Sequence, residues 1–267
     1  MQRRTKKKKK LKLGRIIPVL LVLVLLIAGL SWFAISGHKK KSASSEGQKT
    51  TLTSQNSQGS SDKSSSDSGL PDAKKADWNL VLVNRDNLKP EMNPELTTIG
   101  SIQVDSRIAQ ATSEFLAAAQ NIDPSEHLIS GYRSVAYQTQ LFNQYVENEM
   151  VGGAGSVNEG GPAISKEEAT KNVQTYSQPP EASEHETGLA FDMSTVNSLN
   201  QSDPSVVEQV AKIAPEYGFV LRFPKDGMAS TGVDYEDWHY RYVGVDNAKY
   251  MVAHNLTLED YLKKLPE

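Results

Sequence analysis

Charged and hydrophobic positions divide the chain into four regions. Residues 1–15 are strongly basic, and residues 16–36 begin with a run of 20 uncharged, mostly apolar positions. Residues 37–76 are rich in Ser, Lys, Gln and Gly and contain almost no apolar side chains. Only over residues 77–267 do hydrophobic positions recur with the periods of helices and strands. We therefore expect one folded domain of about 190 residues, which is large enough for a single hydrophobic core.

Short strands and helices follow one another in residues 77–267, without the regular alternation that builds a parallel sheet. Apolar residues three and four positions apart predict helices over 104–122, 135–150, 166–176 and 203–217. Short apolar runs predict strands over 78–83, 127–130, 188–193, 219–223 and 237–243. Two short helices are expected near the C-terminus, the second capped by Thr257. This order predicts an α+β fold in which an antiparallel sheet forms the core and helices flank it.

The N-terminal apolar run predicts a transmembrane anchor. Twenty helical residues span a hydrocarbon core of about 30 Å, and residues 1–15 contain nine Lys or Arg and no acidic residue. The positive-inside rule then keeps the N-terminus in the cytoplasm and exports the rest, as in the cell membrane of a Gram-positive bacterium. A long signal peptide that is later cleaved is the alternative. Residues 37–76 have the composition of a flexible, disordered linker.

Charge excludes one class of partner. Residues 1–41 hold 12 of the 29 basic residues and none of the 32 acidic ones, so 17 basic residues face 32 acidic ones beyond residue 41. A region with a net charge of about −15 does not attract a polyanion, and we expect no nucleic-acid partner. The chain has no cysteine and therefore no disulfide. Its oligomeric state is not predicted.

Two histidine-containing stretches carry the candidate chemistry. In "SEHETGLAFDM" the H-E-x-x-H zinc pattern fails, because Leu189 stands where the second histidine is needed. His185 and Asp192 instead form two thirds of a metal site, which His239 in "DYEDWHYRYV" would complete, with Glu236 as a general base. Each residue also has an ordinary interpretation, as a hydrogen-bonded histidine, a strand-end cap or a solvated acid. Glycine-rich residues 151–162 are expected to form a rim or lid loop of the site.

The same stretches resemble a known family. "SEHETGLAFD" matches the pattern S-x-H-x-x-G-x-A-x-D and "EDWH" matches E-x-W-H, both typical of the zinc D-alanyl-D-alanine carboxypeptidases, which include D,D- and L,D-carboxypeptidases and share the lysostaphin and hedgehog fold. "SGYRS", "YGFVLRFP" and "WHYRYVG" extend the similarity over residues 128–244. The chain departs from the family at Asp237, where many relatives have proline.

The resemblance implies a role for each matching residue. It implies that one zinc ion binds the two histidines and the aspartate, that Glu236 is the base and that Arg133 stabilises the scissile carbonyl. It further implies that the pocket is walled by Trp238 and that substrate binds Ser134, Gln138 and Ser183. The implied function is a membrane-anchored carboxypeptidase that removes D-alanine from peptidoglycan stem peptides. A cross-link endopeptidase and a non-catalytic zinc-containing wall-binding module are the alternatives.

Overall fold

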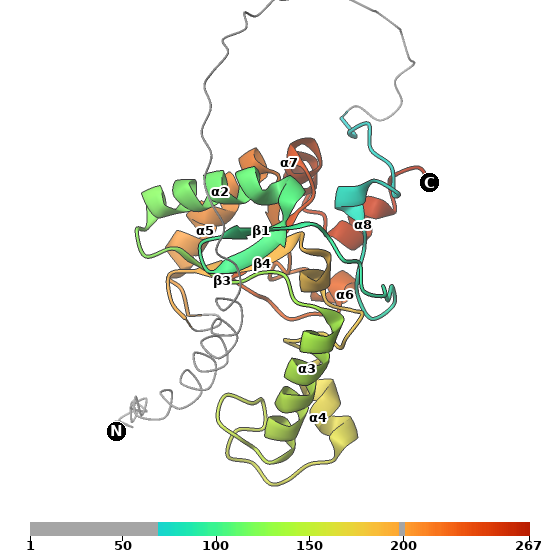
Figure 1. Ribbon diagram of the computed structural model, residues 1–267, viewed down its shortest axis with the longest axis vertical. Coiled ribbons are helices and arrows are strands. Elements are labelled where there is room, and N and C mark those ends of the chain that lie inside the picture. Colours follow the sequence, from blue (N-terminus) through green and yellow to red (C-terminus); the bar gives the residue numbers. More distant parts are fainter. Residues whose placement is uncertain (1–68, 198–200) are drawn as a thin grey trace, which may run out of the picture. The chain divides into compact units, whose positions relative to one another are not determined.

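The computed structural model describes residues 69–197 and 201–267. Within it, Leu70–Glu267 forms a compact unit (Figure 1). This unit starts before the expected boundary at residue 77, because Ala73 is buried and the backbone N–H of Lys75 donates to the carbonyl of Pro266. The expected transmembrane anchor and most of the expected linker lie outside the described residues. Among the described residues, no helix is both long and apolar enough to cross a membrane.

A four-stranded antiparallel sheet forms the centre of the fold, in the order β3-β4-β6-β5. Its strands are β3 (His127–Ser130), β4 (Ala190–Ser194), β5 (Phe219–Leu221) and β6 (His239–Tyr242). All five residues of β4 are buried, as expected for an inner strand with packing on both faces. The predicted α+β fold with an antiparallel sheet is confirmed.

A separate hairpin pairs β1 (Leu96–Ile99) with β2 (Ile102–Asp105). The sequence prediction was wrong here, since Val104 was assigned to a helix face. The helix α2 begins later and spans Ala109–Ile122, after a 3-10 turn η3 at Ser106–Ile108. The expected first strand is also wrong: Trp78–Leu80 forms the 3-10 turn η2.

The remaining helices lie where the hydrophobic pattern indicated, with one addition. α3 spans Val135–Met150 and α4 spans Lys166–Val173, and these two helices pack together at one end of the molecule (Figure 1). α5 (Pro204–Ile213) continues into the 3-10 turn η5 (Ala214–Tyr217). α6 (Met228–Thr231) was not expected, and α7 (Val245–Ala253) and α8 (Leu258–Leu262) end the chain.

The main core lies between the sheet and the helices α2 and α5, which run side by side over it in Figure 1. Phe115 of α2 is fully buried, and its ring contacts three aromatic rings of the sheet strands, those of Phe191, Phe219 and Tyr240. Full burial of such a side chain contributes roughly 2–3 kcal/mol. This packing fixes β4, β5 and β6 against one another, and the candidate site lies on those strands.

Candidate metal centre

Strand register brings two of the predicted metal ligands together. Asp192 of β4 and His239 of β6 are directly paired residues of neighbouring antiparallel strands, so their side chains lie on the same face of the sheet. His185 comes from the 3-10 turn η4 (Glu184–Thr187) immediately before β4. Gly188 ends that turn at φ 69°, and a Cβ there would lie 2.9 Å from the backbone nitrogen of Asp105. Only glycine therefore allows the turn that places His185 beside the strand.

Three donor atoms converge at distances suited to a metal ion. Asp192 Oδ1 lies 3.3 Å from His185 Nε2 and 3.2 Å from His239 Nδ1. Four-coordinate zinc with ligands at 2.0–2.2 Å separates its donors by about 3.3–3.6 Å. The side chains are buried, and the donor atoms all lie within 4.8 Å of one another. Asp192 Oδ1 has no hydrogen-bond partner, which is unusual for a buried oxygen. These residues fit a divalent metal ion.

The electrostatics of the three side chains also favour a cation. Burial lowers the pKa of His185 to about 4, and Arg133 contributes, so its imidazole is neutral and able to ligate. The pKa of Asp192 lies well below its usual range, because both histidines outweigh the effect of burial. Burial opposes a proton on His239, but the nearby carboxylates of Asp192 and Glu184 raise its pKa to about 9. A metal ion would replace that proton on the ring.

Glu236 lies next to the donor cluster. Its Oε2 is 3.7 Å from His239 Nδ1, and burial raises its pKa to about 8. The positive charges of His239 and Arg133 lower this pKa, and the negative charges of Asp192 and Glu184 raise it. Asp237, where the sequence departs from the family pattern, instead raises the pKa of Glu126 and Tyr235. A buried carboxyl group at this position suits a general base whose proton affinity matches neutral pH.

Arg133 is fixed beside the same cluster. Its guanidinium donates to Gln138 Oε1 at 2.8 Å and to Ser130 Oγ at 3.2 Å, and it reaches Asp192 Oδ2 at 3.5 Å. Gln138 is fully buried and donates in turn to the carbonyl of Gln178. The structure therefore places Gln138 behind Arg133, where it orients the guanidinium. A held guanidinium suits an oxyanion that develops during reaction.

The other predicted substrate residues lie near the centre in different settings. Ser134 caps α3, accepting a hydrogen bond from the backbone N–H of Tyr137 at 3.1 Å, so its hydroxyl already has a structural partner. Ser183 is buried at the start of η4, two residues before the first ligand. Trp238 is buried, 5% exposed, and directly precedes His239 in the chain.

Some residues prove to lie away from the centre. His127 bonds to the carbonyl of Ser125 and to Asn197, and His254 bonds to the carbonyl of Tyr250 and stacks on its ring. The glycine-rich loop follows α3 and is held by Glu149, which accepts from two backbone N–H groups of the loop. A 16-residue helix is about 24 Å long, so the loop lies far from Arg133, at the opposite end of α3 (Figure 1). It does not form the expected rim.

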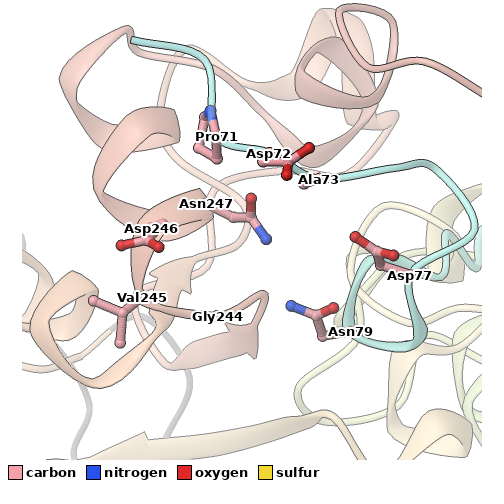
Figure 2. Close-up of a pocket in the computed structure, with 9 residues that line it drawn as sticks. All are labelled: Pro71, Asp72, Ala73, Asp77, Asn79, Gly244, Val245, Asp246 and Asn247. Carbon is pink, nitrogen blue, oxygen red and sulfur yellow. The ribbon is translucent and has the colours of Figure 1, made fainter. Parts of the chain in front are cut away.

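A pocket elsewhere on the chain contains none of the predicted site residues. Figure 2 shows its lining, in which the acidic residues Asp72, Asp77 and Asp246 stand around Asn247. The Asn247 amide is already engaged, donating to Val243 and accepting from Tyr261. The donor cluster on β4 and β6 is therefore the candidate site.

Sequence reasoning missed one part of the site. Glu184, next to His185 in the sequence, lies behind His239 and pairs with two buried arginines, Arg222 and Arg241. Its neighbour in the "SEHE" stretch, Glu186, accepts from the backbone of Glu181 instead. The only signal in the sequence was the concentration of acidic residues around a ligand histidine.

Comparison with known proteins agrees with this geometry. Residues 101–245, more than half of the chain, match the family described as VanY: D-alanyl-D-alanine carboxypeptidase. The chain belongs to the VanY family. A D-alanyl-D-alanine carboxypeptidase of Enterococcus faecalis is 31% identical over 188 residues, which cover 70% of this chain and 66% of that protein. A putative carboxypeptidase of Bacillus subtilis, YodJ, is 35% identical over 142 residues, which cover 51% of this chain and 45% of that protein.

Solved structures of VanY-type proteins share the fold. VanYB in complex with D-alanine-D-alanine gives a TM-score of 0.61, and a VanY D,D-pentapeptidase variant in complex with Zn(II) gives 0.59. Both are 29% identical to this chain and cover 70% of it and 99% of their own length. The LD-carboxypeptidase LdcB gives 0.54 at 29% identity, over 70% of this chain and 87% of its own.

Proposed function

We propose that the chain is a zinc-dependent carboxypeptidase that removes the C-terminal D-alanine from peptidoglycan stem peptides. The observation that carries this proposal is the convergence of His185 Nε2 and His239 Nδ1 on Asp192 Oδ1, at 3.3 and 3.2 Å, with the donor atoms of the three residues within 4.8 Å of one another. Family membership and the zinc-bound VanY structure support the choice of zinc.

In this proposal each side chain acts at a stated atom. The three donors hold the ion, which when bound polarises the scissile carbonyl and acidifies water. The carboxylate of Glu236 accepts a proton from the attacking water and passes it to the amine nitrogen of the departing D-alanine. The guanidinium of Arg133, held by Gln138, stabilises negative charge on the carbonyl oxygen. Trp238 and Ser183 are assigned to the substrate pocket by the family pattern.

The substrate is proposed as the pentapeptide stem, ending in D-alanyl-D-alanine, which makes the enzyme a D,D-carboxypeptidase. The VanY family and the Enterococcus faecalis relative support this choice. The similarity to LdcB makes the tetrapeptide, cut by an L,D-carboxypeptidase, the natural competitor. Pocket shape around the penultimate residue distinguishes the two substrates, since they differ in the stereocentre before the cut.

The test uses the full chain in a mild detergent, with zinc and then with a chelator. Pentapeptide and tetrapeptide stems are incubated separately and their products weighed by mass spectrometry. We expect zinc-dependent loss of one alanine, faster from the pentapeptide. Glu236→Gln serves as the matched control, because it keeps the metal ligands and removes the base. Hydrolysis by this variant at the wild-type rate would refute the assigned role of Glu236. Cleavage only of cross-linked dimers would indicate the endopeptidase, and zinc binding without cleavage of any substrate would indicate a wall-binding module.

We place the catalytic unit outside the cell, tethered to the membrane by residues 16–36. The support is the uncharged run from Ile16 to Ile35 with its basic N-terminal flank, together with the location of a peptidoglycan substrate. Protease added to intact protoplasts tests this topology. Digestion of the catalytic unit is expected, and its protection until the cells are lysed would refute the placement.

A further inference from the structure

Glu184 is a buried carboxylate whose two oxygens face different groups. Its Oε1 accepts from Arg222 Nε and from an Arg241 guanidinium nitrogen, each at 2.8 Å. Its Oε2 lies 3.5 Å from His239 Nε2. Both contacts are ion pairs between buried side chains, so the carboxylate is fixed in position by two guanidinium groups. Glu184 therefore presents a fixed negative charge to the back of a metal-ligand histidine.

The facing atoms lack any other partner. Glu184 Oε2 and His239 Nε2 are both buried without a hydrogen bond among the described residues. Buried polar atoms are nearly always paired, and here an acceptor and a potential N–H donor face each other a few tenths of an ångström beyond hydrogen-bond distance. A small shift of the imidazole ring completes the bond.

The two nitrogens of the His239 ring thus have separate tasks. Nδ1 faces Asp192 Oδ1 and Glu236, on the metal side, while Nε2 faces Glu184. A neutral imidazole ligates through the nitrogen that carries no hydrogen, and the partner of the other nitrogen sets which one that is. His185, the other ligand histidine of the proposed site, is oriented by the backbone instead. Its Nδ1 lies 2.8 Å from the carbonyl oxygen of Gly131, which leaves Nε2 for the metal.

We propose that Glu184 is a positioning residue that holds His239 in the Nε2–H form and orients its Nδ1 for metal binding. The proposal rests on the metal site of the proposed function. The Glu184 carboxylate is itself held by ion pairs that extend to the C-terminal helix α8. Arg222 donates two further hydrogen bonds to Glu259 of α8, at 2.9 and 2.7 Å. Arg241 also donates to the carbonyls of Asn79 and Val81. The two ends of the catalytic unit therefore help to orient one metal ligand.

The test compares two variants that both lack Arg241, one with and one without the Glu184 carboxylate. Removal of Glu184 alone would leave two buried arginines with one carboxylate and could prevent folding. We therefore compare the single variant Arg241→Met with a double variant that carries both Arg241→Met and Glu184→Met. Both lack the same arginine, and they differ only in the carboxylate that faces His239. Far-UV circular dichroism and thermal melting with chelator present confirm folding of each.

The main readout is the zinc dissociation constant of the full chain, measured by competition with a chelating dye. We expect the double variant to bind zinc about 10–100-fold more weakly than Arg241→Met, as is usual for loss of such a partner. Equal affinity of the two variants would overturn the proposal. A second readout is the ring ¹⁵N spectrum of the zinc-loaded protein. In Arg241→Met, the Nε2–H proton of His239 should be shifted downfield and exchange slowly, and in the double variant it should lose both properties. Persistence of both would also overturn the proposal.

These measurements separate the inference from the proposed function. Zinc binding that depends on Glu184, without hydrolysis of any stem peptide, would support the inference and refute the carboxypeptidase. A wild-type chain that does not bind zinc would refute both.

Discussion

Replacement of Glu126 by glutamine is expected to stabilise the protein at alkaline pH and not at acidic pH. Glu126 is 4% exposed, in the connection between α2 and β3, and its Oε2 is buried without a hydrogen bond. Burial raises its pKa from 4.5 to about 7, and the charges of Asp123 and Asp237 add to the effect, while His127 opposes it. Tyr240 is the other titratable group that interacts with it. The folded protein therefore binds the carboxyl proton more tightly than the unfolded chain does.

The sign and size of the effect follow from linkage. Below pH 4.5 the group is protonated in both states and costs nothing, and as the pH rises toward 7 only the unfolded state ionises freely, so stability falls. At 1.36 kcal/mol per pKa unit the full penalty is about 3 kcal/mol. Relaxation of the loop and water penetration reduce the penalty for burying a charged group, and we expect about 1–2 kcal/mol at pH 8. Glutamine keeps the shape and removes the charge, and should therefore recover that amount.

The assay is urea unfolding of wild type and Glu126→Gln at pH 4 and pH 8, with chelator present throughout. Comparison of the two proteins at the same pH cancels every titration that they share. We expect a gain of about 1–2 kcal/mol at pH 8, or roughly 2–8 °C in Tm, and almost none at pH 4. A gain of the same size at both pH values would show that packing, rather than charge, was the cause. Absence of any gain at pH 8 would refute the buried-carboxyl argument.

Four further predictions concern the site. Arg133→Ala should lower kcat/KM about 10²–10³-fold while the zinc dissociation constant changes little; a large loss of zinc binding would mean that its contact with Asp192 is structural. Arg133→Lys should recover only part of the activity, because it lacks the fork that engages Gln138 and Asp192 together, and full recovery would contradict this. Gly188→Ala should destabilise the protein by about 2–4 kcal/mol, because φ is positive and the new Cβ would approach the backbone of Asp105, and an unchanged melting temperature would contradict that. Removal of zinc from a concentration 100-fold above its dissociation constant should lower Tm by about 5–11 °C, whereas a Tm independent of zinc would argue against a site formed in the native state.

Features set by local chemistry were predictable from the sequence. α3 begins after the capping residue Ser134 and spans the expected range, and Asp203 and Gly218 bound the α5–η5 segment as their types predict. The candidate metal ligands could be predicted because their spacing follows a family pattern, and the structure brings these three residues together. The register that pairs Asp192 with His239 also agrees with simple strand alternation.

Other features failed because two local patterns competed. The β1–β2 hairpin turns at Gly100 and Ser101 and carries the signal of a two-residue turn between apolar runs. The hairpin was nevertheless not predicted, because Val104 also fits the helical spacing of Ile108 and Phe115. Tertiary packing decided the outcome: Val104 is fully buried as a strand residue in the same core that it would have joined from a helix.

The acidic residues that flank His185 show a deeper reason why sequence reasoning stops short of a site. Adjacency suggests that Glu184 and Glu186 serve that histidine, but within the 3-10 turn η4 their side chains point to other parts of the fold. Two arginines hold Glu184 against the other candidate ligand, His239, which lies 54 positions after His185 in the chain. The ligand beside them is oriented by the backbone carbonyl of Gly131 instead. The candidate metal ligands can thus be predicted once the family pattern is noticed, whereas the groups that orient them depend on which strands become neighbours.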